Sequence, residues 1–173
     1  TSTSGLDSLS SVGNYTVTPS GVSNTNYNVS YVNGAVNITP AALTITANNA
    51  SRVYGDANPD FSILTSGLVT GDSLDTAGLT FTTTAIATSD VGSYNLTPGG
   101  VTDSNYNISY VAGSLDITPA QLTLTVNDFS RDYGSVNPAF TYTTSGLKAG
   151  DTLSDISSGI YVYTAATQSS SVG

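Results

Sequence analysis

The chain has 173 residues, and its twelve acidic side chains outnumber its three basic ones, for a formal net charge of −9 at pH 7. Binding to nucleic acids or anionic lipids requires lysine and arginine against phosphate, so neither partner is expected, and no apolar run is long enough to insert into a membrane. The chain has no histidine or cysteine, which removes the commonest general base, thiol nucleophiles and zinc ligands. We therefore expect no catalytic residue and no enzyme activity.

Short runs of alternating apolar and polar residues predict β-strands along the chain, and no segment has a sustained helical period. In chain order these runs are 43–46, 79–81, 94–96, 106–110 and 115–117. Glycine, asparagine, aspartate and proline separate them, which is typical of turns. The pattern predicts an all-β fold of small antiparallel β-sandwich modules, immunoglobulin-like in type, with a β-grasp-like module as the alternative.

One local motif favours the immunoglobulin-like version. The segment "DVGSY" at 90–94 has the Asp-x-Gly-x-Tyr spacing of a tyrosine corner, in which the tyrosine hydroxyl bonds to nearby backbone. An earlier copy, "SVGNY", stands at 11–15. Tyr94 is therefore predicted to have a structural role.

The chain repeats itself. Tyr54 returns as Tyr133 and Pro40 as Pro119, which gives a period of 79 residues (133 − 54). Such a period is the signature of a tandem array. We divide the chain into the C-terminal half of one unit (1–39), a complete unit (40–118) and the N-terminal part of the next (119–173). An alternative phase places the units at 12–90 and 91–173. The chain also has no initiator methionine or signal peptide, which predicts an internal segment of a longer exported protein.

Consecutive units are joined by three residues, 40–42 and 119–121, each group led by a proline. Proline fixes one backbone angle, so such a short connection is not a flexible tether. We expect an elongated rod.

The segment "SRVYGDANPDF" at 51–61 returns as "SRDYGSVNPAF" at 130–140. The repeated residues are typical of a structured connection, with glycine for an unusual backbone angle and Asn-Pro for a turn. We predict structural roles for Arg52, Tyr54, Gly55, Arg131, Tyr133 and Gly134. Calcium is the one metal that the composition permits, and the candidate ligands are Asp56 and Asp60. Their counterparts are Ser135 and Ala139, so a site on these side chains would exist in one copy alone.

The two arginines suggest a further structural pairing. Asp72 returns as Asp151, and each lies twenty residues after an arginine (72 − 52 and 151 − 131). A guanidinium group matches a carboxylate in two contacts. We therefore predict that Arg52 pairs with Asp72, and Arg131 with Asp151. The alternative is an arginine that covers Tyr54 and bonds to backbone carbonyls.

Most of the tyrosines are expected in the core. Six of them lie on alternating strand positions in a chain without tryptophan: Tyr15, Tyr27, Tyr31, Tyr94, Tyr106 and Tyr110. Exposed tyrosines and aspartates would instead favour a carbohydrate-binding adhesive module that recognises a polysaccharide or host glycan.

The ordered motifs resemble a known family. "YGDANP", "SGLVTGDSL", "VGSYNLT" and "NYNISYVAGSLDIT" are similar to the MBG/YDG-type (YGX) tandem repeats of large secreted bacterial adhesins and filamentous-haemagglutinin-like exoproteins. The resemblance implies a structural stalk or fibre segment of an adhesin or biofilm-matrix protein, outside the cell or on its surface. It carries over no ligand. Because segments 1–39 and 119–173 together contain the pieces of one unit, we also predict head-to-tail self-association.

Overall fold

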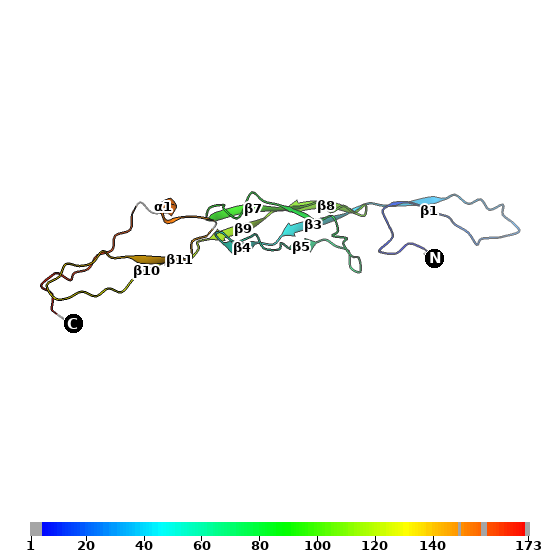
Figure 1. Ribbon diagram of the computed structural model, residues 1–173. Helices are drawn as coiled ribbons and strands as arrows, with labels where there is room; N and C mark the ends of the chain where they lie inside the picture. The colour runs from blue at the N-terminus through cyan, green and yellow to red at the C-terminus, as the bar shows by residue number, and fades with distance from the viewer. Residues whose placement is uncertain (1–4, 149, 157–158, 172–173) are drawn as a thin grey trace. The chain divides into compact units, whose positions relative to one another are not determined.

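A computed structural model describes residues 5–148, 150–156 and 159–171 (Figure 1). The described chain is nearly all β, as predicted, with one helix of four residues, α1 (Leu153–Ile156). The strands are β1 (Gly13–Val17), β2 (Gly34–Ile38), β3 (Ala41–Ala47), β4 (Ala50–Val53), β5 (Ile63–Ser66), β6 (Thr80–Thr82), β7 (Gly92–Gly99), β8 (Tyr106–Val111), β9 (Gly113–Thr118), β10 (Thr123–Val126) and β11 (Tyr142–Ser145).

The strands form four sheets. Residues 40–118 contain a three-stranded sheet of order β5-β3-β8 and a four-stranded sheet of order β4-β9-β7-β6. Before and after them stand two antiparallel pairs, β1-β2 and β10-β11. The fold is sandwich-like, and residues 40–118 contain no helix. The predicted unit boundaries stay a prediction.

Strand β3 shows why the alternating pattern folds as it does. Leu43, Ile45 and Ala47 are buried, and the two threonines between them lie on the outward face. Strand β3 pairs antiparallel with β5 but parallel with β8, from Ala41 opposite Tyr106 onwards. The expectation of a purely antiparallel module is therefore wrong for this pair. Parallel strands require a long crossover, which residues 48–105 provide.

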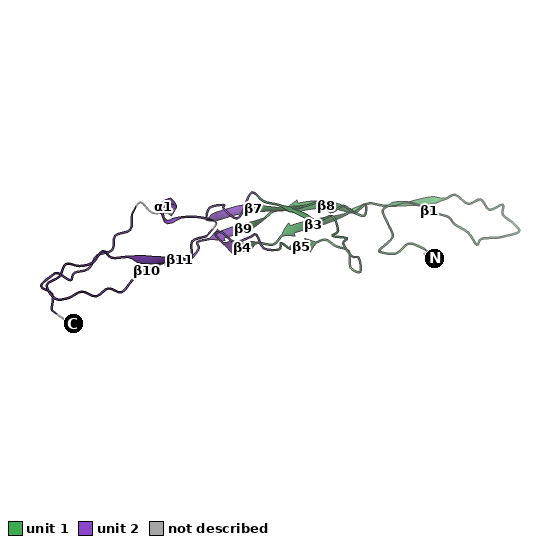
Figure 2. Ribbon diagram, in the orientation of Figure 1, with its two compact units in different colours: residues 1–50, 60–83, 95–114 green, residues 51–59, 84–94, 115–173 purple. Residues whose placement is uncertain are grey.

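The described chain divides into two compact units that interleave along the sequence (Figure 2). Unit 1 comprises residues 1–50, 60–83 and 95–114, and its core cluster is Leu43, Ile45, Val101 and Tyr106. Unit 2 comprises residues 51–59, 84–94 and 115–173, and its buried residues are Arg52, Ala85, Leu115 and Ile117.

The tyrosine corner is confirmed in both copies. The Tyr94 hydroxyl donates a hydrogen bond of 2.8 Å to the carbonyl of Asp90. The Tyr15 hydroxyl donates one of 2.7 Å to the carbonyl of Ser11. Both bonds reach backbone, which is why serine can replace aspartate at the first position of the motif.

The expectation that most tyrosines form the core is wrong. Of the six, Tyr106 alone is buried, whereas its counterpart Tyr27 is 75% exposed. Tyr110 is partly exposed and instead bonds to backbone: its hydroxyl accepts from the Val101 N–H at 2.9 Å and donates to the Val101 carbonyl at 2.7 Å. Tyrosine has an apolar ring and a polar hydroxyl, so it is suited to the edge of the core, where the hydroxyl can bond to backbone.

Candidate functional site

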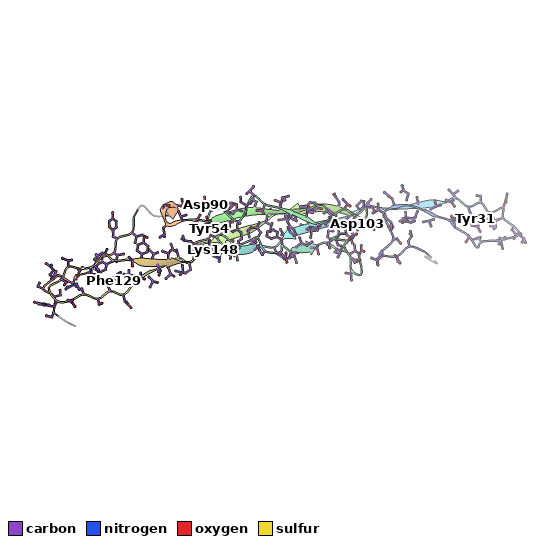
Figure 3. All side chains as sticks on the ribbon, in the orientation of Figure 1. Tyr31, Tyr54, Asp90, Asp103, Phe129 and Lys148 are labelled. Carbon is purple, nitrogen blue, oxygen red and sulfur yellow. The ribbon has the colours of Figure 1, made fainter. Side chains whose placement is uncertain are left out.

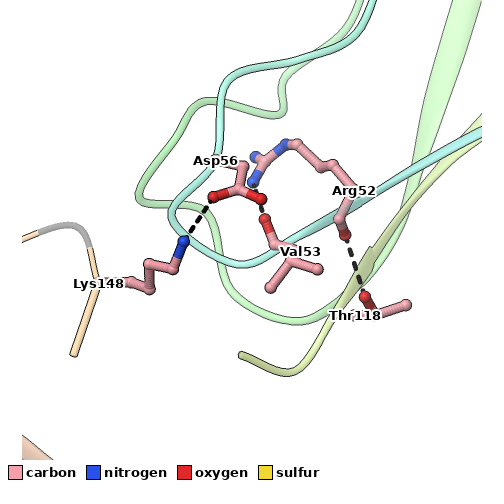
Figure 4. Close-up of polar contacts among 5 residues, drawn as sticks. All are labelled: Arg52, Val53, Asp56, Thr118 and Lys148. Atoms are coloured by element: carbon pink, nitrogen blue, oxygen red, sulfur yellow. Dashed lines mark hydrogen bonds and ion pairs between the residues drawn. The ribbon is translucent and has the colours of Figure 1, made fainter. Parts of the chain in front are cut away.

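The segment that the sequence repeats most closely is built around one buried cation. Arg52, in β4, is 7% exposed (Figure 4). Its Nε donates to Oδ1 of Asn58 at 2.8 Å, its Nη1 to the Val53 carbonyl at 3.3 Å, and its Nη2 to the Ile86 carbonyl at 2.5 Å. Neutral oxygens therefore solvate this charge in place of water, which the burial of a cation requires.

The groups around Arg52 are themselves held in place. The Asn58 amide Nδ2 donates to the carbonyl of Ala85 at 2.9 Å, so one side chain binds both the guanidinium and the 84–94 segment. Thr118, at the end of β9, donates from its hydroxyl to the Arg52 carbonyl at 3.2 Å (Figure 4). The Thr118 carbonyl accepts from the Tyr54 N–H at 2.8 Å. Gly55 has a φ of 83°, which a residue with a side chain rarely adopts, and it allows the turn that follows Tyr54. We call Arg52, Asn58 and the carbonyls they bind the arginine clamp.

The arginine clamp occurs twice. Arg131 donates from Nε to Oδ1 of Asn137 at 2.7 Å and from Nη2 to the carbonyl of Thr167, the counterpart of Ile86. Asn137 donates from Nδ2 to the carbonyl of Ala166 at 2.9 Å. Arg131 is half-buried where Arg52 is buried. The bonding pattern is thus a property of the repeat, whereas the burial differs between the copies.

The predicted pairs of arginine with aspartate are wrong, because both guanidinium groups bind an asparagine side-chain oxygen and backbone carbonyls. The bonds to backbone carbonyls agree with that part of the alternative. Asp72 lies in unit 1, where it accepts a hydrogen bond of 2.7 Å from the Tyr106 hydroxyl and one of 2.8 Å from the Ser73 N–H. These bonds hold the pKa of Asp72 below its usual value. Asp151 accepts a bond of 3.3 Å from the Tyr54 hydroxyl. This hydrogen bond raises the pKa of Tyr54, with burial and the charge of Asp151 as smaller causes.

A second contact joins the same two loops. Lys148, labelled in Figure 3, forms an ion pair of 2.8 Å between its Nζ and Oδ1 of Asp56 (Figure 4). It is the one ion pair among the described residues. Tyr54, Lys148 and Asp151 also line a hollow of about 200 Å³ with Pro119 and Leu122. The connection at 51–59 and the Gly-Asp loop near 145–151 are therefore held together within unit 2 by one ion pair and one hydrogen bond.

The calcium expectation rests on Asp56 and Asp60. In the part of the chain that the structure describes, no three acidic side chains gather where a metal ion could bind. The Asp56 carboxylate is instead bound by Lys148. Calcium binding stays a prediction. Among the described residues, no helix is long and apolar enough to cross a membrane.

The family model described as "MBG domain (YGX type)" matches residues 43–116 and 122–173. The chain belongs to the MBG domain family of the YGX type. The MBG domain is a repeat module of adhesin-like proteins and not an enzyme family, and it is typical of secreted surface adhesins. Comparison with curated proteins and with solved structures finds no match.

The sequence pattern indicates that Arg52 and Arg131 are structural residues, but it does not reveal most of their partners. The carbonyls of Ile86 and Ala85 carry no sequence signal, because any residue offers a carbonyl. Asn58 did carry one: it returns as Asn137, six residues after the arginine in both copies. The ion pair of Lys148 with Asp56 has no counterpart in the other copy, where Val69 stands for Lys148, so the repeat could not reveal it.

Proposed function

We propose that this MBG chain is a structural stalk or fibre segment of a secreted bacterial adhesin or biofilm-matrix protein, and that its role is to give reach and assembly. It works outside the cell or on its surface. The observation that carries the proposal is the pair of contacts between the two loops of unit 2, in which Tyr54 bonds to Asp151 and Lys148 to Asp56. All four residues lie in the compact unit 2, but they belong to different sequence repeats. Tyr54 and Asp56 belong to the predicted repeat 40–118, and Lys148 and Asp151 belong to the partial repeat that follows it, 119–173.

A spacer needs neighbouring modules to hold a limited range of angles. The linker at 119–121 limits that range through its length and its proline. The contacts of Tyr54 and Lys148 add two bonds directly across the join. The exposed ion pair contributes little free energy, about 0–1 kcal/mol, but it disfavours orientations in which Lys148 and Asp56 separate.

The arginine clamp fits the same role. It uses a charge to hold two loops together, and each of the three guanidinium nitrogens of Arg52 donates a hydrogen bond to an oxygen of unit 2. Hydrogen bonds around a buried arginine rigidify a module that has few large apolar residues.

Carbohydrate binding is the second candidate, and one observation favours it. Tyr161 and Tyr163 are 90% and 89% exposed, and the counterparts of both in the preceding copy are threonines, Thr80 and Thr82. The repeat therefore does not need aromatic rings at these two positions. Exposed aromatic faces two residues apart are suited to stacking on sugar rings.

A glycan array and a pull-down with matrix polysaccharide, both on the 173-residue chain, test the proposal. The stalk role predicts no saturable binding. Binding that free sugar competes away, and that is lost when Tyr161 and Tyr163 are both replaced by threonine, would establish the carbohydrate-binding module instead. The matched control replaces Tyr27, which is exposed on unit 1, by threonine.

A further inference from the structure

Two tyrosines of the second repeat differ from the other tyrosines in their surroundings. Tyr161 and Tyr163 are 90% and 89% exposed, the largest exposures among the large apolar side chains that the structure describes. Six other tyrosines direct their hydroxyls to groups of the chain itself: Tyr15, Tyr31, Tyr54, Tyr94, Tyr106 and Tyr110. A ring as exposed as that of Tyr161 presents both its hydroxyl and the carbon atoms beside it to other molecules.

This exposure is a property of the two positions within the repeat. Their counterparts in the complete repeat are Thr80 and Thr82 in β6. Strand β6 pairs there with β7, and both threonines are exposed, whereas Phe81 between them is half-buried. The positions of Tyr161 and Tyr163 therefore face outward even where all the strands of the repeat are present.

The composition directs oxidation to tyrosine. The sulfur atoms of cysteine and methionine are common points of oxidative attack. The chain has no cysteine, methionine, tryptophan or histidine. The phenol of tyrosine is then the most readily oxidised group in the chain, and Tyr161 and Tyr163 are its most accessible phenols.

We propose that Tyr161 and Tyr163 form a site of oxidative cross-linking, at which a peroxidase with hydrogen peroxide joins tyrosines of two copies of this chain as dityrosine. Each phenol gives one electron and one proton to the oxidant, so two phenols reduce one hydrogen peroxide to two water molecules. The two tyrosyl radicals couple through ring carbons beside their hydroxyls, and a carbon–carbon bond forms. The hydrogen atom on each coupled carbon moves to the phenol oxygen, which restores both aromatic rings.

The coupling needs only an encounter between two exposed rings and no stable interface between the chains. The formal charge of −9 makes two copies repel each other. Residues 159–171, however, contain no charged side chain, so this segment adds no like charge beside the rings. The preceding copy has Thr80 and Thr82 at these positions, so the cross-links would be confined to the repeats that carry tyrosine there.

This inference goes beyond the proposed function, because it concerns covalent links between neighbouring chains and holds whether or not the chain binds a sugar. Peroxidase treatment of the full chain tests it. Unlabelled and heavy-nitrogen-labelled chains are mixed, treated with peroxidase and hydrogen peroxide, and digested for mass spectrometry, which detects each link as the loss of two hydrogen atoms. We expect covalent dimers with mixed-isotope links, most of them at Tyr161 or Tyr163. Links found only within single chains, or spread equally over all exposed tyrosines, Tyr27 and Tyr133 included, would overturn the proposal.

Substitutions test the two positions directly. Tyr161→Thr with Tyr163→Thr places there the residues of the preceding copy, and it should lose most of the dimer. Tyr161→Phe with Tyr163→Phe keeps both aromatic faces, which sugar stacking would use, and should lose the dimer equally, since phenylalanine has no phenol to oxidise. The control Tyr27→Thr with Tyr31→Phe removes as many tyrosines and should keep most of the dimer. Equal dimer yields from the control and either double variant, with folding verified by circular dichroism, would contradict the assignment.

Discussion

Tyr106 donates a hydrogen bond of 2.7 Å from its hydroxyl to Oδ2 of Asp72, and the same hydroxyl accepts one of 3.1 Å from the Val69 N–H. This contact anchors the "SGLVTGD" loop to β8, the strand that pairs with β3. The loop of the following copy, with Asp151, is bound instead by Tyr54. The repeated aspartate thus accepts a tyrosine hydroxyl in each copy, from a different strand end.

The first prediction is a pH dependence of stability at both extremes. The hydrogen bond from Tyr106 is the main cause that lowers the pKa of Asp72, and the bond to Asp72 is the main cause that raises the pKa of Tyr106. The lowered carboxyl pKa stabilises the fold above the unfolded value, and this contribution is lost as the pH falls below about 4. The raised phenol pKa stabilises the fold below the unfolded value, and this contribution is lost as the pH rises above about 10. Melting temperatures between about pH 2 and pH 11 measure both limbs. Asp72→Asn should flatten the acid limb, and an unchanged acid limb in that variant would contradict the assignment.

The second prediction compares the two arginine clamps. Arg52→Ala should lower the free energy of unfolding by about 3 kcal/mol or more, because three charge-assisted bonds of a buried side chain disappear. Arg131→Ala should cost about 1 kcal/mol, since water can replace the lost bonds around a half-buried side chain. Arg52→Lys should also be less stable than the unmodified chain, because an ammonium group cannot reach three separate oxygens as the planar guanidinium group of arginine does. Urea titrations of the variants measure the difference, and equal costs at both positions would show that burial does not decide it.

The third prediction uses the tyrosines that bond to backbone. Tyr110→Phe should cost about 1–3 kcal/mol, because the Val101 N–H and carbonyl would lose their partner, and Val101 is 5% exposed. Its matched control is Tyr31→Phe. The Tyr31 hydroxyl makes the same two bonds to Val22, at 2.7 and 2.6 Å, but Val22 is 61% exposed. Water would satisfy the Val22 groups, so the control should cost less than about 0.5 kcal/mol. Calorimetry of both variants tests this, and a larger loss in Tyr31→Phe would be the contrary result.

The fourth prediction concerns the glycine of the "SGL" motif. Gly67 has a φ of +96°, and a Cβ there would overlap the carbonyl oxygen of Ala42. Gly146 repeats this geometry against the carbonyl of Gln121. Gly67→Ala should therefore destabilise the fold by more than about 1 kcal/mol. Gly34→Ala is the control, since its φ is not positive and nothing lies within 4 Å of the added carbon. Thermal unfolding that ranks the two alanine variants in the opposite order would show that the close approach is not limiting.

Alternation and repetition made much of this fold predictable. Leu43, Ile45, Leu115 and Ile117 are inward-facing strand residues because apolar and polar positions alternate there, and the tyrosine corner follows from its spacing. The parallel pairing of β3 with β8 could not be read from the pattern, because alternation is the same in both directions. Tyr27 and Tyr106 have similar sequence contexts, NYNVS and NYNIS, yet one is exposed and the other buried. Burial depends on which strands are present to cover a residue, and a local pattern does not contain that information.

The candidate site was predictable in position and less so in partners. Repetition of Arg52, Gly55 and Asn58 located the connection that holds β4. The recurrence of Asp72 as Asp151, twenty residues after an arginine in each copy, then favoured a carboxylate partner for each arginine. The structure satisfies the guanidinium with carbonyl oxygens, which every residue has, and assigns Asp72 to a tyrosine hydroxyl. The sequence indicates which charged side chains recur, but it does not indicate which backbone carbonyls lie near an arginine.

Small-angle X-ray scattering of a series of chains tests the stalk proposal most directly. The series is the 173-residue chain and two longer chains in which residues 40–118 are present once or twice more. If the joins hold consecutive repeats extended, each added repeat should increase the maximum dimension by the same amount, about 30–45 Å for strands of this length with their loops. A maximum dimension that grows only as expected for a compact globule, or whose increment shrinks with each repeat as flexible joins would allow, would contradict the stalk proposal.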